Sequence, residues 1–275
     1  MTYKTILTYW DSETFSEARV ESAAAFAERL DAHLDVVAFG YEPDIPPYAF
    51  GGTSAAAMAD FYGQAKAEAE GLAQKASAVI ERMGARGEAE PVVSTYSGLP
   101  MAMGSRARFA DLVIASQPYE TTFEHAAVNV LEGALFEGEA PTLVLPLKPA
   151  AVSPETVVIG WNGSREALRA VKGAMPVLTR AKSVEIAILE PSSEEETPGE
   201  DVALMLSRHG VHAEVVLLPR TGDSLSAAMR QHLRERGADL LVMGAYSHSR
   251  IRQFVLGGMT RDLLGDVPLP ILMAH

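Results

Sequence analysis

The sequence of 275 residues contains no cysteine. Disulfide bonds, thiol catalysis and zinc or iron–sulfur sites held by cysteine are therefore excluded. It also has no uninterrupted run of 18 apolar residues, so we expect no membrane span. The N-terminal stretch reaches an acidic residue, Asp11, too early for a signal peptide, so we expect a cytoplasmic protein.

Positive charge is scarce as well. Lys and Arg number 23 against 36 Asp and Glu, which gives a net charge of −13. Such a chain repels phosphate backbones at long range, so we expect no general binding to nucleic acid. The acidic excess is uneven: residues 1–150 hold 10 basic and 21 acidic residues, whereas residues 151–275 hold 13 and 15. The two halves of the chain therefore differ in character.

The two halves nevertheless repeat each other. The only two tryptophans, Trp10 and Trp161, end matching apolar stretches 151 residues apart. Further matches follow in the same order, at 89–98 and 213–222, at 110–114 and 238–242, and at 141–145 and 270–274. We infer two copies of one domain, at 1–149 and 150–275, because a fixed order of matches indicates an internal duplication. The joint at 147–154 contains two prolines, which disfavour regular structure.

Each copy alternates strand and helix. In the second copy, runs of Val, Ile and Leu without polar alternation predict strands covered on both faces, at 156–161, 184–190, 212–218, 239–244 and 270–274. Apolar residues at helical spacing predict helices at 164–178, 201–209 and 224–236, the last ended by Gly237. This order predicts an α/β fold of two tandem, doubly wound, mostly parallel five-stranded sheets of Rossmann-like type.

The segment after the fourth strand of the second copy carries the chemistry. Met243 and Gly244 lead into a Gly/Ser loop, and the pair Gly257 and Gly258 opens a helix near Thr260. Glycines let backbone amides approach a ligand closely, and a helix start adds free N–H groups with partial positive charge. Together these features suit a phosphate. Three arginines add to the local positive potential: Arg250, Arg252 and Arg261.

On these residues the second copy resembles the universal stress protein family across its full length. The family's ATP-binding members carry a Gly-x2-Gly-x9-Gly-(Ser/Thr) segment at this place. Gly244 and Gly257 fit its first and third glycines, whereas Ser247 replaces the second. Gly258 replaces the closing Ser/Thr, and Thr260 offers a hydroxyl two residues on.

The resemblance implies an adenine-nucleotide site, for ATP or a related nucleotide, with Mg²⁺ if ATP is bound. Asn162 stands where the family has an acidic residue near the ribose, and Trp161 precedes it. Independently of any ligand, 162–164 predicts a turn and a helix cap. The expected nucleotide-binding residues are Gly160, Trp161, Asn162, Leu189, Met243, Gly244, Ser247, His248, Gly257, Gly258, Met259 and Thr260.

The first copy is more diverged. It keeps Asp11 after its first strand, but no glycine falls where Gly244 or Gly257 would be. We therefore expect that it lacks the phosphate site and pairs with the second copy as a scaffold. A long apolar insertion at 43–63, which includes Tyr48 and Phe50, suggests a lid or a contact surface.

The sequence is compatible with three functions. The first is a tandem universal stress protein that binds ATP in its second copy and acts as a stress sensor or interaction protein. The second is a nucleotide-free interaction module of the same fold, and the third is a slow ATP hydrolase. No catalytic set emerges, and the seven histidines show no metal spacing, so we expect neither an established enzyme activity nor a metal site. A homodimer through an edge strand such as 270–274 is a further expectation.

Overall fold

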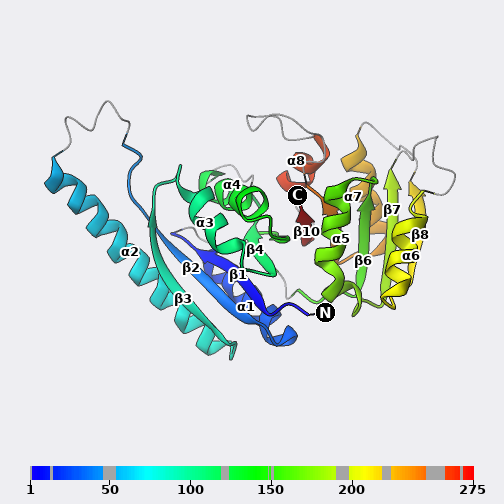
Figure 1. Cartoon of the computed structure of the whole chain (residues 1–275), viewed down its shortest axis with the longest axis horizontal. Coiled ribbons are helices and arrows are strands. Elements are labelled where there is room, and N and C mark those ends of the chain that lie inside the picture. The colour runs from blue at the N-terminus through cyan, green and yellow to red at the C-terminus, as the bar shows by residue number, and fades with distance from the viewer. Residues whose placement is uncertain are drawn as a thin grey trace. The chain divides into compact units, whose positions relative to one another are not determined.

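The computed structural model describes residues 2–12, 15–45, 54–118, 124–147, 149, 152–189, 198–218, 224–245, 258–266 and 269–275. The chain divides into two compact units (Figure 1). The N-terminal unit comprises residues 3–140 and 147–151, and the C-terminal unit comprises residues 1–2, 141–146 and 152–275.

The C-terminal unit is built on a parallel sheet with one antiparallel strand. Its strand order is β5-β10-β9-β6-β7-β8, and β5 runs antiparallel to β10. The strands are β5 (Thr142–Leu145), β6 (Thr156–Trp161), β7 (Ser183–Leu189), β8 (Ala213–Leu218), β9 (Leu240–Gly244) and β10 (Ile271–Ala274). The helices are α5 (Arg165–Leu178), α6 (Glu200–Arg208), α7 (Leu225–Arg236) and α8 (Gly258–Gly265).

The ends of these helices follow from local chemistry. Ser164 and Ser224 precede α5 and α7, and each side chain accepts a hydrogen bond from the backbone N–H three residues on. Such caps satisfy amides that have no partner inside the helix. Gly237 ends α7 in the left-handed region at φ 59°, where glycine carries no steric cost. The helix ends expected from these residues are therefore confirmed.

The N-terminal unit repeats this architecture. Its parallel strands lie in the order β3-β2-β1-β4. The strands are β1 (Thr5–Trp10), β2 (His33–Tyr41), β3 (Gly87–Ser94) and β4 (Leu112–Ser116). The helices are α1 (Ser16–Leu30), α2 (Ala55–Arg82), α3 (Leu99–Ala107) and α4 (Glu124–Glu132), and the π-helical turn η2 (Gly133–Glu137) follows α4.

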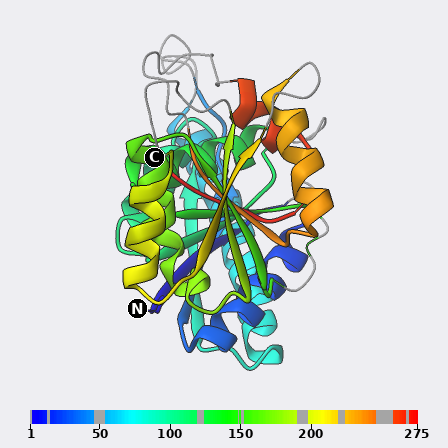
Figure 2. The same cartoon turned by 90° about the vertical axis from the view of Figure 1, so that its right-hand side faces the viewer.

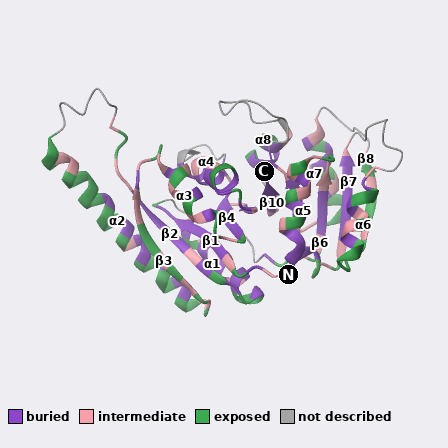
Figure 3. Ribbon diagram, viewed as in Figure 1, coloured by how far each residue is buried: buried purple, intermediate pink, exposed green. Residues whose placement is uncertain are grey.

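Burial follows the sheets. In the N-terminal unit one core cluster joins Leu7 and Tyr9 of β1, Phe39 of β2, and Leu99 and Met103 of α3. Figure 3 shows β1, β2 and β4 as buried strands, whereas α2 buries one side and exposes the other. The mostly parallel, doubly wound α/β fold expected from the sequence is confirmed.

Two details differ from the sequence-based expectation. The stretch 270–274 is not an edge strand, because β10 pairs with β9 on one side and with β5 on the other. In addition, the second part of the expected insertion 43–63 belongs to α2, a single helix of 28 residues that begins at Ala55. Tyr48 and Phe50 lie outside the described residues, and Phe61 and Tyr62 are exposed on α2.

No helix of the described chain is both long and apolar enough to cross a membrane.

Candidate functional site

The candidate nucleotide site lies at the carboxyl edge of the C-terminal sheet. The chain passes outward from β6 to β7 and β8, and then returns to place β9 on the opposite side of β6. The adjacent carboxyl ends of β6 and β9 therefore form the topological switch point, where ligands bind in sheets of this kind. The parallel register brings Gly160 beside Met243. Trp161, Asn162 and Gly244 follow at the same edge.

Gly244 has a packing role. A Cβ atom at this position would lie 2.5 Å from the backbone nitrogen of Ala167 and 2.9 Å from the carbonyl carbon of Glu166, both in the first turn of α5. Glycine is thus required for the close approach of α5 to β9. By contrast, a Cβ at Gly160 would make only ordinary contacts, the nearest at 3.5 Å to Met229 Cε. Packing therefore explains the presence of Gly244, which fits the first glycine of the family motif, without any ligand.

Asn162 and Ser164 form the expected turn and cap. Asn162 Oδ1 accepts a hydrogen bond from the backbone N–H of Ser164 at 3.2 Å. Ser164 Oγ accepts one from the backbone N–H of Ala167 at 3.1 Å. The side chain of Asn162 is exposed, and Trp161 is half-buried beside it. Both side chains can therefore meet a ligand at the strand edge.

The remaining described residues of the candidate nucleotide site differ in their exposure to solvent. Leu189 ends β7 and is half-buried, whereas Met243 is buried and belongs to the core. On α8, Met259 is half-buried, Thr260 is buried and Arg261 is exposed.

The helix α8 is tied to α7, which it lies beside in Figure 2. Ser226 Oγ donates a hydrogen bond to the Asp262 carboxylate at 3.0 Å. Arg230 donates to the backbone carbonyl of the same aspartate and lies 4.0 Å from Asp266. These contacts fix the position of the helix whose first residue, Gly258, was expected to face a phosphate. Its neighbour Gly257, together with Ser247, His248, Arg250 and Arg252, lies outside the described residues.

The matching edge of the N-terminal unit carries different residues. The β1–β4 register pairs Ile6 with Leu112, as the β6–β9 register pairs Val157 with Leu240. This alignment places Tyr9 at the position of Gly160, Ser116 at that of Gly244, and Asp11 at that of Asn162.

A buried arginine, 1% exposed, joins these three residues. Arg19 Nη2 and Nε donate to the carbonyl oxygen of Tyr9 at 3.0 and 3.2 Å, and Nη1 donates to Ser116 Oγ at 2.6 Å. Its guanidinium also lies 3.7 Å from the Asp11 carboxylate and 3.5 Å from the centre of the Tyr9 ring. Ser16 completes the network by donating to Asp11 and accepting from Arg19.

This network lies at the edge of the N-terminal sheet that corresponds to the candidate nucleotide site. Where the C-terminal unit has Gly160 and Gly244, the N-terminal unit has Tyr9 and Ser116, and the side chain of Arg19 contacts both. A buried arginine needs such a set of partners, because an unpaired buried charge costs several kcal/mol. Arg19 is not predictable from the sequence, because nothing in its spacing distinguishes it from an exposed helical arginine.

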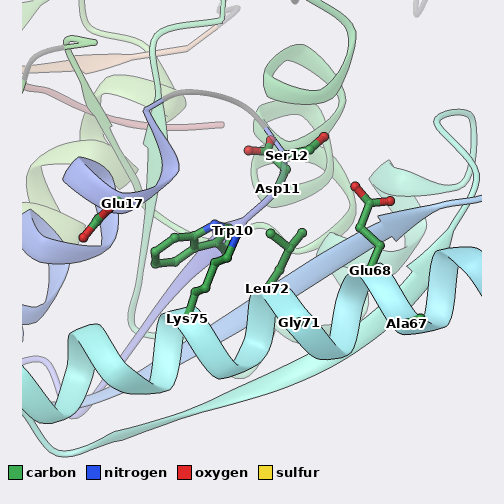
Figure 4. Close-up of a pocket in the computed structure, with 9 residues that line it drawn as sticks. All are labelled: Trp10, Asp11, Ser12, Glu17, Ala67, Glu68, Gly71, Leu72 and Lys75. Atoms are coloured by element: carbon green, nitrogen blue, oxygen red, sulfur yellow. The ribbon is translucent and has the colours of Figure 1, made fainter.

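The N-terminal unit does contain a pocket, on the side of β1 that faces α1 and α2 (Figure 4). Its volume is about 600 Å³. Trp10 and Leu72 are its large apolar residues, and Glu68 and Lys75 project from α2 on the same side as Leu72, with Lys75 directed toward Trp10. Its full lining is Trp10, Asp11, Ser12, Glu17, Ala67, Glu68, Gly71, Leu72 and Lys75. The mixed charges and apolar wall distinguish it from a phosphate cradle.

Comparison with known proteins shows which family the C-terminal region is similar to. Residues 154–275 match the model of the universal stress protein family. A 68-residue stretch is 38% identical to universal stress protein Slr1230 of Synechocystis sp. (strain ATCC 27184 / PCC 6803 / Kazusa), and this match spans 25% of the present chain and 23% of that relative. Residues 154–275 are therefore similar to the universal stress protein family.

Solved structures extend the likeness in fold to the whole chain. A universal stress protein from Archaeoglobus fulgidus DSM 4304 superposes with a TM-score of 0.73 at 15% identity, covering 98% of this chain and 97% of that one. A putative universal stress protein from Pseudomonas aeruginosa UCBPP-PA14 gives a TM-score of 0.55 at 13% identity, covering 98% and 92%. At such identities the likeness shows the fold, which the N-terminal unit therefore shares.

Proposed function

We propose that the protein is a tandem universal stress protein whose C-terminal domain, residues 150–275, binds an adenine nucleotide, ATP in particular. The N-terminal domain, residues 1–149, serves as a scaffold for it. The protein then acts as a nucleotide-responsive sensor or interaction protein in the stress response.

The observation that carries the proposal is the edge formed by β6 and β9. Trp161 and Asn162 stand there with an aromatic ring and an amide, the two kinds of group that suit an adenine base and a ribose hydroxyl. The register of β6 and β9 brings their carboxyl ends together at the switch point. The family match covers this same region.

Charge supports the choice of domain. Residues 151–275 have a net charge of −2, whereas residues 1–150 have −11, so a polyphosphate is repelled less by the C-terminal domain. The N-terminal start of α8 adds a partial positive charge, and Arg261 lies in its first turn. Bound ATP would bring Mg²⁺ on its phosphates.

The test is calorimetric titration of the full chain with Mg-ATP, after mass spectrometry of any ligand released on denaturation. We expect one nucleotide per chain. The double variant G257L/G258L should weaken binding at least about tenfold, because side chains replace the expected backbone approach to the phosphates. The matched control is G265L in the same helix, since a Cβ at Gly265 meets no atom within 4 Å.

Unchanged affinity in the folded double variant would refute the site assignment. Two nucleotides per chain would show that the N-terminal domain also binds, against the scaffold role. No titratable nucleotide would favour a second candidate, a nucleotide-free interaction module. Gly244 supports that candidate, because packing against α5 is enough to explain why position 244 is a glycine. Slow hydrolysis is tested in the same samples by phosphate release above a heat-killed control.

A further inference from the structure

Three side chains that can ligate metal meet on one face of the N-terminal sheet. His33 and Asp35 are two residues apart on β2, so their side chains leave the same face of the strand. Glu88 lies on the neighbouring strand β3, directly beside Asp35 in the parallel register. One ligand atom from each of the three residues lies within 4.8 Å of the other two. His33 Nε2 is 3.2 Å from Asp35 Oδ1.

The position of this cluster leaves it accessible. Val37 and Phe39, the next residues on the same face of β2, are buried in the core cluster with Leu99 and Met103 of α3. His33 and Asp35 lie at the start of β2, and their side chains are 48% and 36% exposed. Ions from solution therefore reach the cluster, while the sheet holds its backbone in place.

The electrostatics of the cluster favour a cation. Among the described residues, neither Asp35 nor Glu88 forms an ion pair with a lysine or arginine, whereas the nearby Glu90 pairs with Arg106 at 2.7 Å. Two adjacent carboxylates without a basic partner other than histidine repel each other, and a shared cation removes that repulsion.

We propose that His33, Asp35 and Glu88 form a binding site for a divalent transition metal of the Zn²⁺ type. Imidazole suits zinc and its neighbours, whereas Mg²⁺ and Ca²⁺ prefer oxygen ligands alone. Bonds of about 2.0–2.2 Å in a tetrahedron place ligand atoms about 3.3–3.6 Å apart. The 3.2 Å between His33 Nε2 and Asp35 Oδ1 is close to this spacing, and the Glu88 carboxylate must close up from a separation of at most 4.8 Å. Three protein ligands leave a fourth position of the tetrahedron for water or an external group.

Histidine spacing along the chain does not reveal this site. Glu88 is far from His33 in the sequence, and only the pairing of β2 with β3 brings the two together. The sequence signal is a single His-x-Asp pair on a strand, which an ordinary surface ion pair also produces. The expectation of no metal site rested on histidines alone, whereas two of the three ligands here are carboxylates.

The proposal is tested by titrating the EDTA-treated full chain, free of any affinity tag, with Zn²⁺ by calorimetry and by competition with a chromogenic chelator. We expect one tight Zn²⁺ per chain and no comparable binding of Mg²⁺. The variants H33Q, D35N and E88Q should each weaken binding at least about 100-fold, since even loss of a group behind a ligand costs 10–100-fold. The matched control E90Q makes the same chemical change as E88Q on the same strand, β3. It should bind Zn²⁺ like the wild type.

Circular dichroism of each variant separates loss of the site from loss of the fold. Wild-type protein that takes up no Zn²⁺ would overturn the proposal, since the cluster would then be a surface ion pair only. Tight binding that survives in H33Q and E88Q would also overturn it, because the ion would then bind elsewhere. The nucleotide titration proposed above is independent of either result, as it concerns the other unit.

Discussion

The buried Arg19 network lends itself to a quantitative test. Arg19→Met keeps the volume and the helix propensity, but it removes the cation beside the Asp11 carboxylate and the donor to the Tyr9 carbonyl and to Ser116 Oγ. Removal of one partner of a buried ion pair costs about 3–5 kcal/mol. We therefore expect the N-terminal unit to lose about 3–5 kcal/mol of unfolding free energy.

The two tryptophans make this measurement specific to one unit. Trp10 lies in the N-terminal unit and Trp161 in the C-terminal unit, so the W161F background leaves the fluorescence of Trp10 as the reporter of N-terminal unfolding in urea. The matched control is R82M, which breaks the exposed pairs of Arg82 with Glu17 and Glu21. Exposed pairs contribute at most about 1 kcal/mol.

A loss below about 1 kcal/mol for R19M would refute the reasoning, because the network would then contribute no more than an exposed pair. The double variant D11L/R19M refines the test. Since it removes both charges, it should recover much of the stability that R19M loses. If the double variant is as unstable as R19M, the buried Asp11 charge that has lost its cation is not the source of the loss.

Three further predictions concern single side chains. Gly244→Ala should destabilise by about 1–3 kcal/mol in urea unfolding, because its Cβ would lie 2.5 Å from the Ala167 nitrogen, whereas Gly160→Ala should be tolerated. Ser164→Ala should cost about 1 kcal/mol in the same assay through loss of the α5 cap; no change would mean that water replaces it. Burial raises the pKa of Glu132, so its ionised form destabilises the fold. Glu132→Gln should therefore raise Tm at pH 7, and the gain should vanish below the ordinary glutamate pKa; an equal gain at both pH values would contradict this.

Local signals in the sequence predict much of the C-terminal unit. The strand 156–161 and the cap at Ser164 follow from apolar runs and hydroxyl caps, which act within a few residues. Contacts between distant segments are different, because register and pairing decide them. The antiparallel pairing of β5 with β10 is one example, and the meeting of His33 with Glu88 is another. The burial of Arg19 is a third, since only the folded core supplies its partners.

The candidate nucleotide site shows the same division. Its turn at Asn162 is local and follows from the residues themselves. The role of Gly244 is not local, because the atoms that exclude a Cβ belong to α5, far along the chain. A motif glycine can therefore match a family pattern for a reason of packing, and the sequence alone does not separate the two causes.

The pairing of β5 with β10 bears on how the protein can be divided into fragments. The sequence repeat ends near residue 150, but the C-terminal unit already includes residues 141–146. A fragment cut at the repeat boundary would strip β5 away and leave Ile271, Leu272 and Met273 of β10 with unpaired backbone groups. An apolar strand with a free edge recruits other chains, so such a fragment would self-associate. A fragment that starts before Pro141 would carry its own edge protection and is the one suited to separate study.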